Sequence, residues 1–186
     1  MAILKDPGRR WRCARGAVFG LFLLFLHPGA ASPLEEYDVK AAFLFNFAKF
    51  IEWPETAMDG EKARFTLGVL GEDPFGEVLL EVARGKTLNG RPVEVRQART
   101  VSELAGCDVV FLAASEEKRI ERHLKALGGT PALTVSDTAG FARRGGMIEL
   151  YLDGNRIRFA INLKAMRETG LEPSSKLLAL ARIVDG

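Results

Sequence analysis

The sequence predicts an α/β fold: a single domain of three layers with a mostly parallel sheet, a long aromatic-rich helix near its N-terminus, and a C-terminal hairpin plus helices. Short apolar runs that are typical of strands alternate with longer stretches of helical periodicity, which is the pattern of α/β proteins. One stretch near the start contains neither Gly nor Pro and predicts the long helix. Near the end, two strand-like runs flank Asp153, Gly154 and Asn155, a sequence typical of a tight hairpin turn.

The boundaries of the predicted elements come from apolar runs and from residues that begin or end helices. Asp73 is a helix-capping residue, and Pro74 suits the first position of the helix that follows it. The expected strands are residues 65–70, 93–95, 108–113, 132–135, 148–152 and 157–161. The expected helices are residues 34–53, 74–83, 115–127, 163–169 and 174–181, with a short helical turn through Phe141.

Residues 1–31 have the make-up of a cleaved secretory signal peptide. Five basic side chains precede the uninterrupted apolar run 17–26, and Gly29 and Ala31 occupy the small-residue positions before a cut at Ser32. At a rise of 1.5 Å per residue, this run spans only about 15 Å of a hydrocarbon core that is about 30 Å thick. We therefore expect cleavage between Ala31 and Ser32, export to the periplasm, and one α/β domain over residues 32–186 that does not itself span the membrane.

Removal of this segment changes the charge of the chain. The whole sequence has 26 Lys and Arg against 24 Asp and Glu, and residues 1–31 contain five of the bases and one of the acids. The mature chain would therefore carry 21 basic and 23 acidic side chains. A slightly acidic chain lacks the basic surface that nucleic-acid binding requires, so we expect no nucleic-acid partner.

Few residues remain that could support catalysis or hold a metal. The mature chain would keep one cysteine, Cys107, and one histidine, His123, which are too few to build a zinc site without carboxylates as most of the ligands. Cys107 could be a buried thiol, a reactive thiol or half of an intermolecular bridge. His123 lies in a charged helical stretch and is expected to face solvent, and Ser115 is better explained as a helix cap than as a nucleophile. The sequence predicts no enzyme, no cofactor and no metal site.

The predicted helix 34–53 is apolar around most of its circumference. One stripe contains Phe43, Phe47 and Phe50, and it lies beside a second apolar stripe that includes Tyr37 and Leu44. Two interpretations stay open. The helix could be buried between the sheet and another element, or the aromatic stripe could contact a second protein chain.

Polar residues that follow the predicted strands indicate a possible ligand site. The carboxyl ends of parallel strands are where open α/β sheets bind small molecules, and Asp73, Ser115, Ser136 and Asp137 lie at such ends. Ser136 and Asp137 could equally cap the turn that follows them. Arginine side chains suit carboxylate or phosphate groups, and the candidates for this role are Arg143, Arg144 and Arg158.

The sequence resembles the YfiR/HmsC family of periplasmic proteins. The resemblance begins in residues 40–54, KAAFLFNFAKFIEWP, and continues through residues 71–76, GEDPFG, and residues 107–111, CDVVF. Further matching blocks follow in the same order over nearly the whole mature chain: LTVSD at 133–137, FA at 141–142 with GGMI at 145–148, IRFAINL at 157–163 and SSKLLALA at 174–181. The order and spacing of these blocks make the resemblance specific.

The resemblance implies a non-enzymatic regulator that binds the periplasmic sensing domain of an inner-membrane diguanylate cyclase, or of a similar signalling protein, and represses it. Such repression would control cyclic-di-GMP, exopolysaccharide and biofilm. The candidate contact residues are the aromatic stripe of Phe43, Phe47 and Phe50 and a loop that contains Phe141, Gly145, Gly146 and Met147. A homodimer is a further possible assembly. The alternative function is binding of a small anion or metabolite at Asp73, Ser136, Asp137 and Arg158.

The cysteine content departs from that of the best-known relatives, which carry cysteine pairs able to form disulfides. Only Cys107 would remain here after processing. Control through an intramolecular disulfide is therefore not expected.

Overall fold

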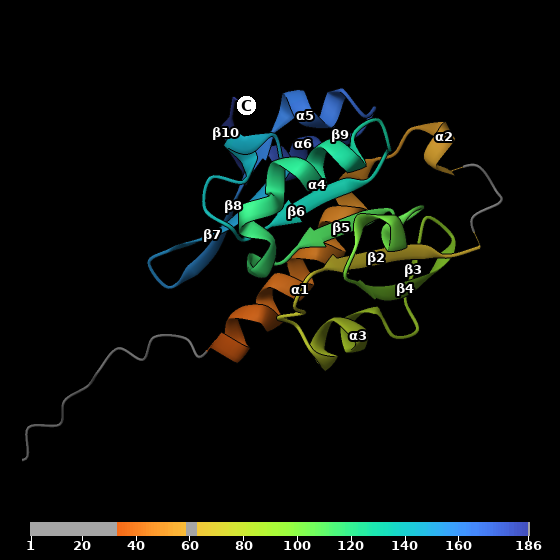
Figure 1. The fold of residues 1–186 in the computed structure, drawn as a ribbon. Coiled ribbons are helices and arrows are strands. Elements are labelled where there is room, and N and C mark those ends of the chain that lie inside the picture. The colour runs from red at the N-terminus through yellow and green to blue at the C-terminus, as the bar shows by residue number, and fades with distance from the viewer. Residues whose placement is uncertain (1–32, 59–62, 186) are drawn as a thin grey trace, which may run out of the picture.

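The computed structural model describes residues 33–58 and 63–185, and over these residues it confirms the α/β fold in three layers (Figure 1). The predicted signal peptide and its cleavage site lie outside the described residues. An eight-stranded sheet forms the middle layer of the described part of the chain, in the order β10-β8-β7-β6-β5-β2-β4-β3. A separate pair of short strands, β1 and β9, lies beside it.

The central strands β4, β2, β5, β6 and β7 are parallel to one another, and the hairpin β7–β8 and the edge strand β3 supply the antiparallel pairs. Every residue of β2 is buried, as expected for a parallel strand that is covered on both faces. The strand bounds are β1 Ile51–Glu52, β2 Phe65–Leu70, β3 Thr87–Leu88, β4 Arg91–Ala98, β5 Val109–Leu112, β6 Leu133–Ser136, β7 Ile148–Asp153, β8 Arg156–Asn162, β9 Glu172–Pro173 and β10 Arg182–Val184.

Helices and 3-10 turns cover both faces of the sheet. The α-helices are α1 Pro33–Phe50, α2 Glu55–Met58, α3 Glu77–Ala83, α4 Ile120–Leu127, α5 Leu163–Arg167 and α6 Ser175–Leu178. The 3-10 turns are η1 Val101–Leu104, η2 Ala114–Arg119 and η3 Ala142–Arg144. In Figure 1, α4 crosses in front of the sheet and α1 passes behind it. Each face has its own apolar core, one with α1 and α3 and the other with α4 and η1.

The long predicted helix ends three residues earlier than expected. α1 stops at Phe50, whose carbonyl oxygen accepts a hydrogen bond from the amide of Ser174 at 2.8 Å. The next two residues form β1, which pairs with β9. Pairing with a distant segment thus ends the helix before the proline at position 54 does so.

Two further helices begin later in the chain than the predicted capping residues Asp73 and Ser115 had indicated. Asp73 does not cap α3, since its carboxylate accepts a hydrogen bond from the amide of Phe75 in a local turn. Gly76, with φ of 54°, then separates this turn from the helix that begins at Glu77. The segment predicted as a helix from Ser115 starts instead as the 3-10 turn η2 and becomes α-helical at Ile120.

Candidate functional site

An apolar groove lies on the outer surface between α1 and α6, and we call it the α1–α6 groove. It has a volume of about 160 Å³. Its lining residues are Phe43, Asn46, Phe47, Phe50, Phe159, Lys176, Leu177 and Leu180. The three aromatic residues of the predicted contact stripe therefore share one groove, and β8 and α6 supply the rest of its wall.

The floor of the groove is a cluster of three aromatic rings. The ring of Phe47 lies 5.0 Å from that of Phe159 and 5.6 Å from that of Phe43, measured between centroids. Phe47 is fully buried and belongs to the core, whereas Phe43 is half-buried. Tilted and edge-to-face contacts of this kind are favoured between aromatic side chains, so the floor is well packed.

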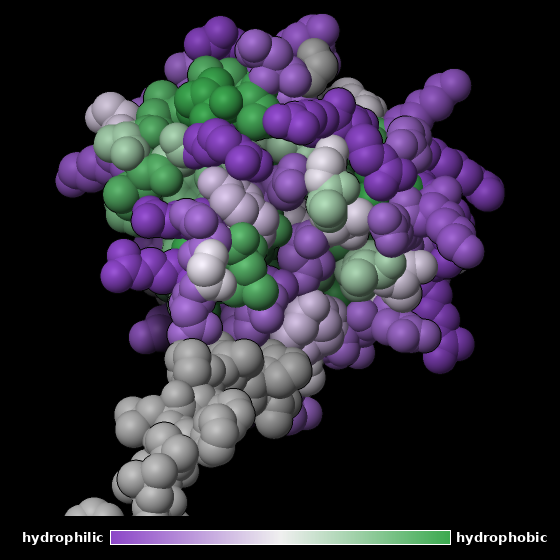
Figure 2. Space-filling model, turned by 90° about the vertical axis from the view of Figure 1, so that its left-hand side faces the viewer, coloured by the Kyte–Doolittle hydropathy of each residue, from purple (hydrophilic) through white to green (hydrophobic). Residues whose placement is uncertain are grey.

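The rim of the groove exposes large apolar side chains. Phe50 is 39% exposed and Leu180 is 69% exposed. Exposed apolar residues also include Ile183 on β10 and Leu152 in the hairpin. Figure 2 shows one side of the molecule, on which hydrophobic residues are gathered in patches among hydrophilic ones. Grouped apolar residues of this kind on a protein surface are typical of sites where another molecule binds.

The loop predicted as a second contact surface is mostly buried. Of its four predicted contact residues, Phe141, Gly146 and Met147 are buried and Gly145 is exposed. A Cβ atom at Gly146 would lie 2.1 Å from the ring of Phe141, so this glycine lets the loop close over the ring. In this conformation, the loop offers a partner little apolar surface.

The four residues predicted to bind a ligand each contact a different part of the fold. Asp73 accepts a hydrogen bond from Gln97, and Ser136 donates one to the carbonyl oxygen of Leu112. Ser136 also accepts from the amide of Thr138, in agreement with its predicted role in the following turn. Arg158 forms an ion pair with Asp153 within the hairpin.

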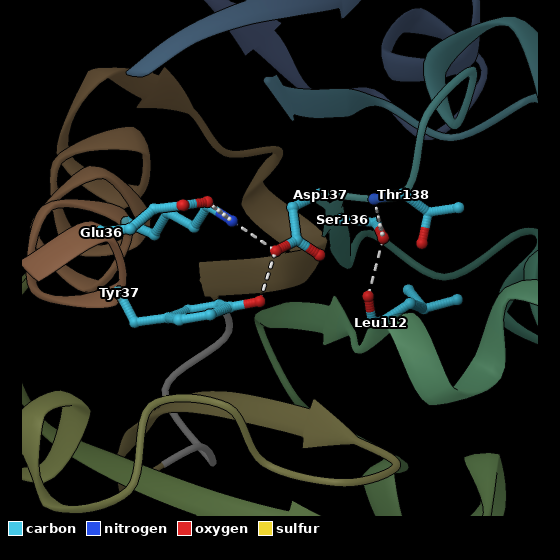
Figure 3. A network of polar contacts seen from close by, with 7 residues as sticks. Glu36, Tyr37, Leu112, Ser136, Asp137 and Thr138 are labelled. Carbon is cyan, nitrogen blue, oxygen red and sulfur yellow. Dashed lines mark hydrogen bonds and ion pairs between the residues drawn. The ribbon is translucent and has the colours of Figure 1, made fainter. Parts of the chain in front are cut away.

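Asp137 connects the carboxyl end of β6 to α1. Its Oδ2 atom accepts from the hydroxyl of Tyr37 at 2.8 Å and from the ammonium group of Lys40 at 2.5 Å. Figure 3 shows the side chains of Tyr37 and Asp137 pointing toward one another, with Glu36 beside them. Burial and the hydrogen bond to Asp137 raise the pKa of Tyr37 above its usual value. The contacts of Asp137 therefore hold α1 against the sheet.

A polar cleft of about 730 Å³ lies where β2, β4 and β5 end. We call it the switch-point cleft, because β4 and β5 lie on opposite sides of β2 and the direction of strand succession reverses there. Its lining residues are Gly71, Glu72, Gln97, Ala98, Arg99, Glu103, Ser115, Glu116 and Arg119. Among these residues, the sequence had indicated only Ser115 as part of a ligand site. The others could not be selected, because the order of the strands decides which loops meet and the sequence does not give that order.

Two residues near this cleft, His123 and Ser115, correct expectations from the sequence. His123 is buried rather than solvated, and its Nε2 atom lies 2.7 Å from the carboxylate of Glu116. Ser115 does not cap a helix, because its hydroxyl accepts a hydrogen bond from the amide of Glu72 at 2.9 Å. A histidine in a charged stretch of sequence can be buried when a carboxylate satisfies the hydrogen bonding of its ring.

Cys107 is buried, which agrees with the first of the three interpretations of this residue, a buried thiol. Within residues 33–58 and 63–185, no group of three or more His, Cys, Asp and Glu side chains is arranged to hold a metal ion. No helix in the described part of the chain is long and apolar enough to cross a membrane.

An α/β domain with an apolar groove on one surface and an open polar cleft on another has features that are typical of binding proteins. A family model described as YfiR/HmsC-like matches residues 37–182, and the chain belongs to this family. The match confirms the resemblance drawn from the sequence. The family consists of periplasmic regulators in cyclic-di-GMP signalling rather than of enzymes.

Proposed function

We propose that this protein binds the periplasmic sensing domain of an inner-membrane diguanylate cyclase, or of a similar membrane signalling protein, and represses it. Repression would lower cyclic-di-GMP and with it biofilm and exopolysaccharide. Membership of the YfiR/HmsC-like family supports a role in cyclic-di-GMP signalling. The signal peptide predicted at residues 1–31 supports export to the compartment in which such a sensing domain would be met.

The observation that carries the proposal is the α1–α6 groove. Side chains such as Phe50 and Leu180 expose apolar surface to water. Contact with water disfavours such surface, and covering it with a partner would be favourable. The few residues that dominate the energy of protein interfaces are typically aromatic side chains in well-packed pockets from which water is excluded. The partner is therefore expected to insert an apolar side chain between α1 and α6.

The binding surface is proposed to centre on Phe43 and Phe50, with Leu180 on the opposite wall. Phe47 would act from below, because its buried ring supports the ring of Phe43. The loop of Phe141, Gly145, Gly146 and Met147 could take part only after a rearrangement that exposes Phe141.

The proposal is tested by measuring the affinity of the purified protein for the periplasmic domain of its membrane partner. The partner is first identified by crosslinking in cells. Phe50→Asp and Leu180→Asp are expected to weaken binding at least about tenfold, since each puts a charge into the apolar contact. The matched control is Leu80→Asp on α3, because Leu80 is also 39% exposed but lies outside the groove. Equal affinity of all three variants and the wild type would contradict the proposal.

A homodimer could use the same groove, since an apolar patch on one copy can pair with the same patch on another. Sedimentation velocity over a range of concentrations separates this case from binding of a different partner. A dimer that Phe50→Asp dissociates and Leu80→Asp leaves intact would assign the groove to self-association.

The alternative function, binding of a small anion or metabolite, is favoured by one specific observation. The switch-point cleft is an open polar cavity at the edge of the sheet where α/β proteins bind ligands.

A further inference from the structure

The switch-point cleft lies at the position in an open α/β sheet where neighbouring loops separate and leave a crevice. The chain passes from β2 through α3 to β4 on one side, and then returns to β5 on the other side of β2. The loop that follows β2 therefore leads toward β4, while the loop that follows β5 leads in the opposite direction, toward β6. A volume of about 730 Å³ lies within the range of about 300–1,000 Å³ that is usual for small-molecule sites.

The floor of this cleft depends on a glycine. Gly71 has φ of 97°, and a Cβ atom there would lie 2.5 Å from the hydroxyl of Ser115 and 2.8 Å from the side chain of Glu116. The loop after β2 can approach η2 this closely only without a side chain at position 71. The amide of Glu72 completes the contact by donating to the hydroxyl of Ser115. Two loops that are far apart in the sequence are thus joined into one surface.

A buried carboxylate holds an arginine at the wall of the cleft. The side chain of Glu116 is only 5% exposed, and its Oε1 atom accepts from Arg119 at 2.7 Å while its Oε2 atom contacts His123 at 2.7 Å. The side chain of Arg119 is 57% exposed, so one nitrogen of its guanidinium is fixed by Glu116 and the group is still open to solvent. Fixing a guanidinium beforehand lowers the entropy that a ligand must remove on binding.

The charges of the cleft define the chemistry of a ligand. Arg99 and Arg119 supply two guanidinium groups, which bind carboxylate and phosphate oxygens well. The cleft is also lined by the carboxylates of Glu72, Glu103 and Glu116, and that of Glu116 is already paired with Arg119. The carboxylate of Glu103 already accepts a hydrogen bond from Thr100 at 2.6 Å, whereas Glu72 is exposed at the rim. An anion without hydrogen-bond donors would meet repulsion from these acids, while hydroxyl or amino groups would satisfy them.

We infer that the switch-point cleft binds a small oxyanion, a carboxylate or phosphate that also carries hydroxyl or amino groups, with Arg119 as its principal anchor. The cleft and the α1–α6 groove share no lining residue. This inference therefore stands or falls independently of the proposed protein partner.

Isothermal titration calorimetry on the purified protein at fixed ionic strength tests the inference with four probes. Tartrate and glycerol 3-phosphate carry an oxyanion and hydroxyl groups, succinate carries carboxylates alone, and glycerol carries hydroxyl groups alone. We expect binding of tartrate, glycerol 3-phosphate or both, and the one that binds identifies the oxyanion as carboxylate or phosphate. Succinate should bind more weakly than tartrate, and glycerol should show no binding.

The variant Arg119→Gln is expected to weaken binding of the active probe by at least about tenfold, as loss of a charge-assisted contact requires. The matched control is Arg122→Gln on α4, because Arg122 is exposed but does not line the cleft. Both variants should still unfold cooperatively above the temperature of the titration in the absence of probe, with Arg119→Gln somewhat less stable because the buried Glu116 loses a charged partner. Failure of both tartrate and glycerol 3-phosphate to bind, or equal binding by Arg119→Gln and the wild type, would overturn the inference. Equal affinity for succinate and tartrate would overturn the role given to the hydroxyl groups.

Discussion

The side chain of Lys40 lies on α1 with only 5% of its surface exposed, and two carboxylates surround its ammonium group. The Nζ atom lies 2.5 Å from Asp137 and 2.5 Å from Glu36 one helical turn earlier. The side chain of Asp137 is equally buried, at 7% exposed. Removing one member of a buried ion pair leaves the other charge without compensation, which costs more than the pair contributes.

Lys40→Met is therefore expected to lower the free energy of unfolding by about 3–5 kcal/mol, because Asp137 would keep only the hydroxyl of Tyr37 as a partner. Urea denaturation measures the change, and Lys86→Met at an exposed position is the control. A loss no larger than that of the control would show that the contacts of Asp137 do not hold α1 in place.

Tyr37 predicts a specific dependence of stability on alkaline pH. Its pKa is raised in the folded state, so the protonated phenol is favoured there and contributes stability fully at pH values below the unfolded pKa of about 10. This contribution decreases as the pH rises further, since the unfolded chain loses the proton first. The difference in unfolding free energy between the wild type and Tyr37→Phe should consequently shrink between about pH 9 and pH 11. A difference that stays constant over this range would contradict the assignment.

At the scale of elements, α1 combines the two interpretations that its sequence left open. Phe47 packs into the core against Phe159, while Phe50 on the same stripe reaches the surface. Periodicity predicts which residues share a stripe, but the width of the contact between helix and sheet decides where the stripe leaves the core. The sequence alone therefore could not assign Phe47 to the interior and Phe50 to the rim.

The two phenylalanines should respond differently to truncation. Phe47→Ala is expected to lower the free energy of unfolding by about 3–5 kcal/mol, because it leaves a cavity in the aromatic cluster. Phe50→Ala should cost less than about 1 kcal/mol, since 39% of the residue is already exposed. Denaturant unfolding of both variants is the measurement, and a similar loss for the two would place Phe50 in the core as well.

The elements that the sequence predicted best are those with strong local signals. The predicted strand 65–70 coincides with β2, because a short and largely apolar run followed by turn residues favours a buried strand. The hairpin was also predicted, since Gly154 and Asn155, which form its turn, are residues that favour tight turns. β1, β9 and β10 were missed because these strands of two or three residues pair with segments distant in the sequence. The two-residue strand β3, which pairs with the nearby β4, was missed as well.

At the scale of the whole molecule, the order of the strands decides which residues can act together. The sequence indicated residues at strand ends, including Asp73, Ser115 and Asp137, without indicating which ends are neighbours. In the structure, Ser115 lines the switch-point cleft. Asp137 lies outside this cleft and binds the side chain of Lys40 on α1. Arg119 and Glu116 could not have been selected beforehand, because their role depends on Gly71 bringing two loops together.

The two surface features suit a regulator with two separate functions. The α1–α6 groove has the apolar character of a protein contact, and the switch-point cleft has the polar character of a small-molecule site. The groove carries the central claim, since it is the surface through which the proposed repression of a membrane signalling partner would take place.

The cellular concentration of cyclic-di-GMP tests that claim most directly. It should rise when the gene is deleted and return to its original value on expression of the wild type or Leu80→Asp, but not of Phe50→Asp at equal protein abundance. An unchanged concentration after deletion, or full restoration by Phe50→Asp, would contradict repression through the α1–α6 groove.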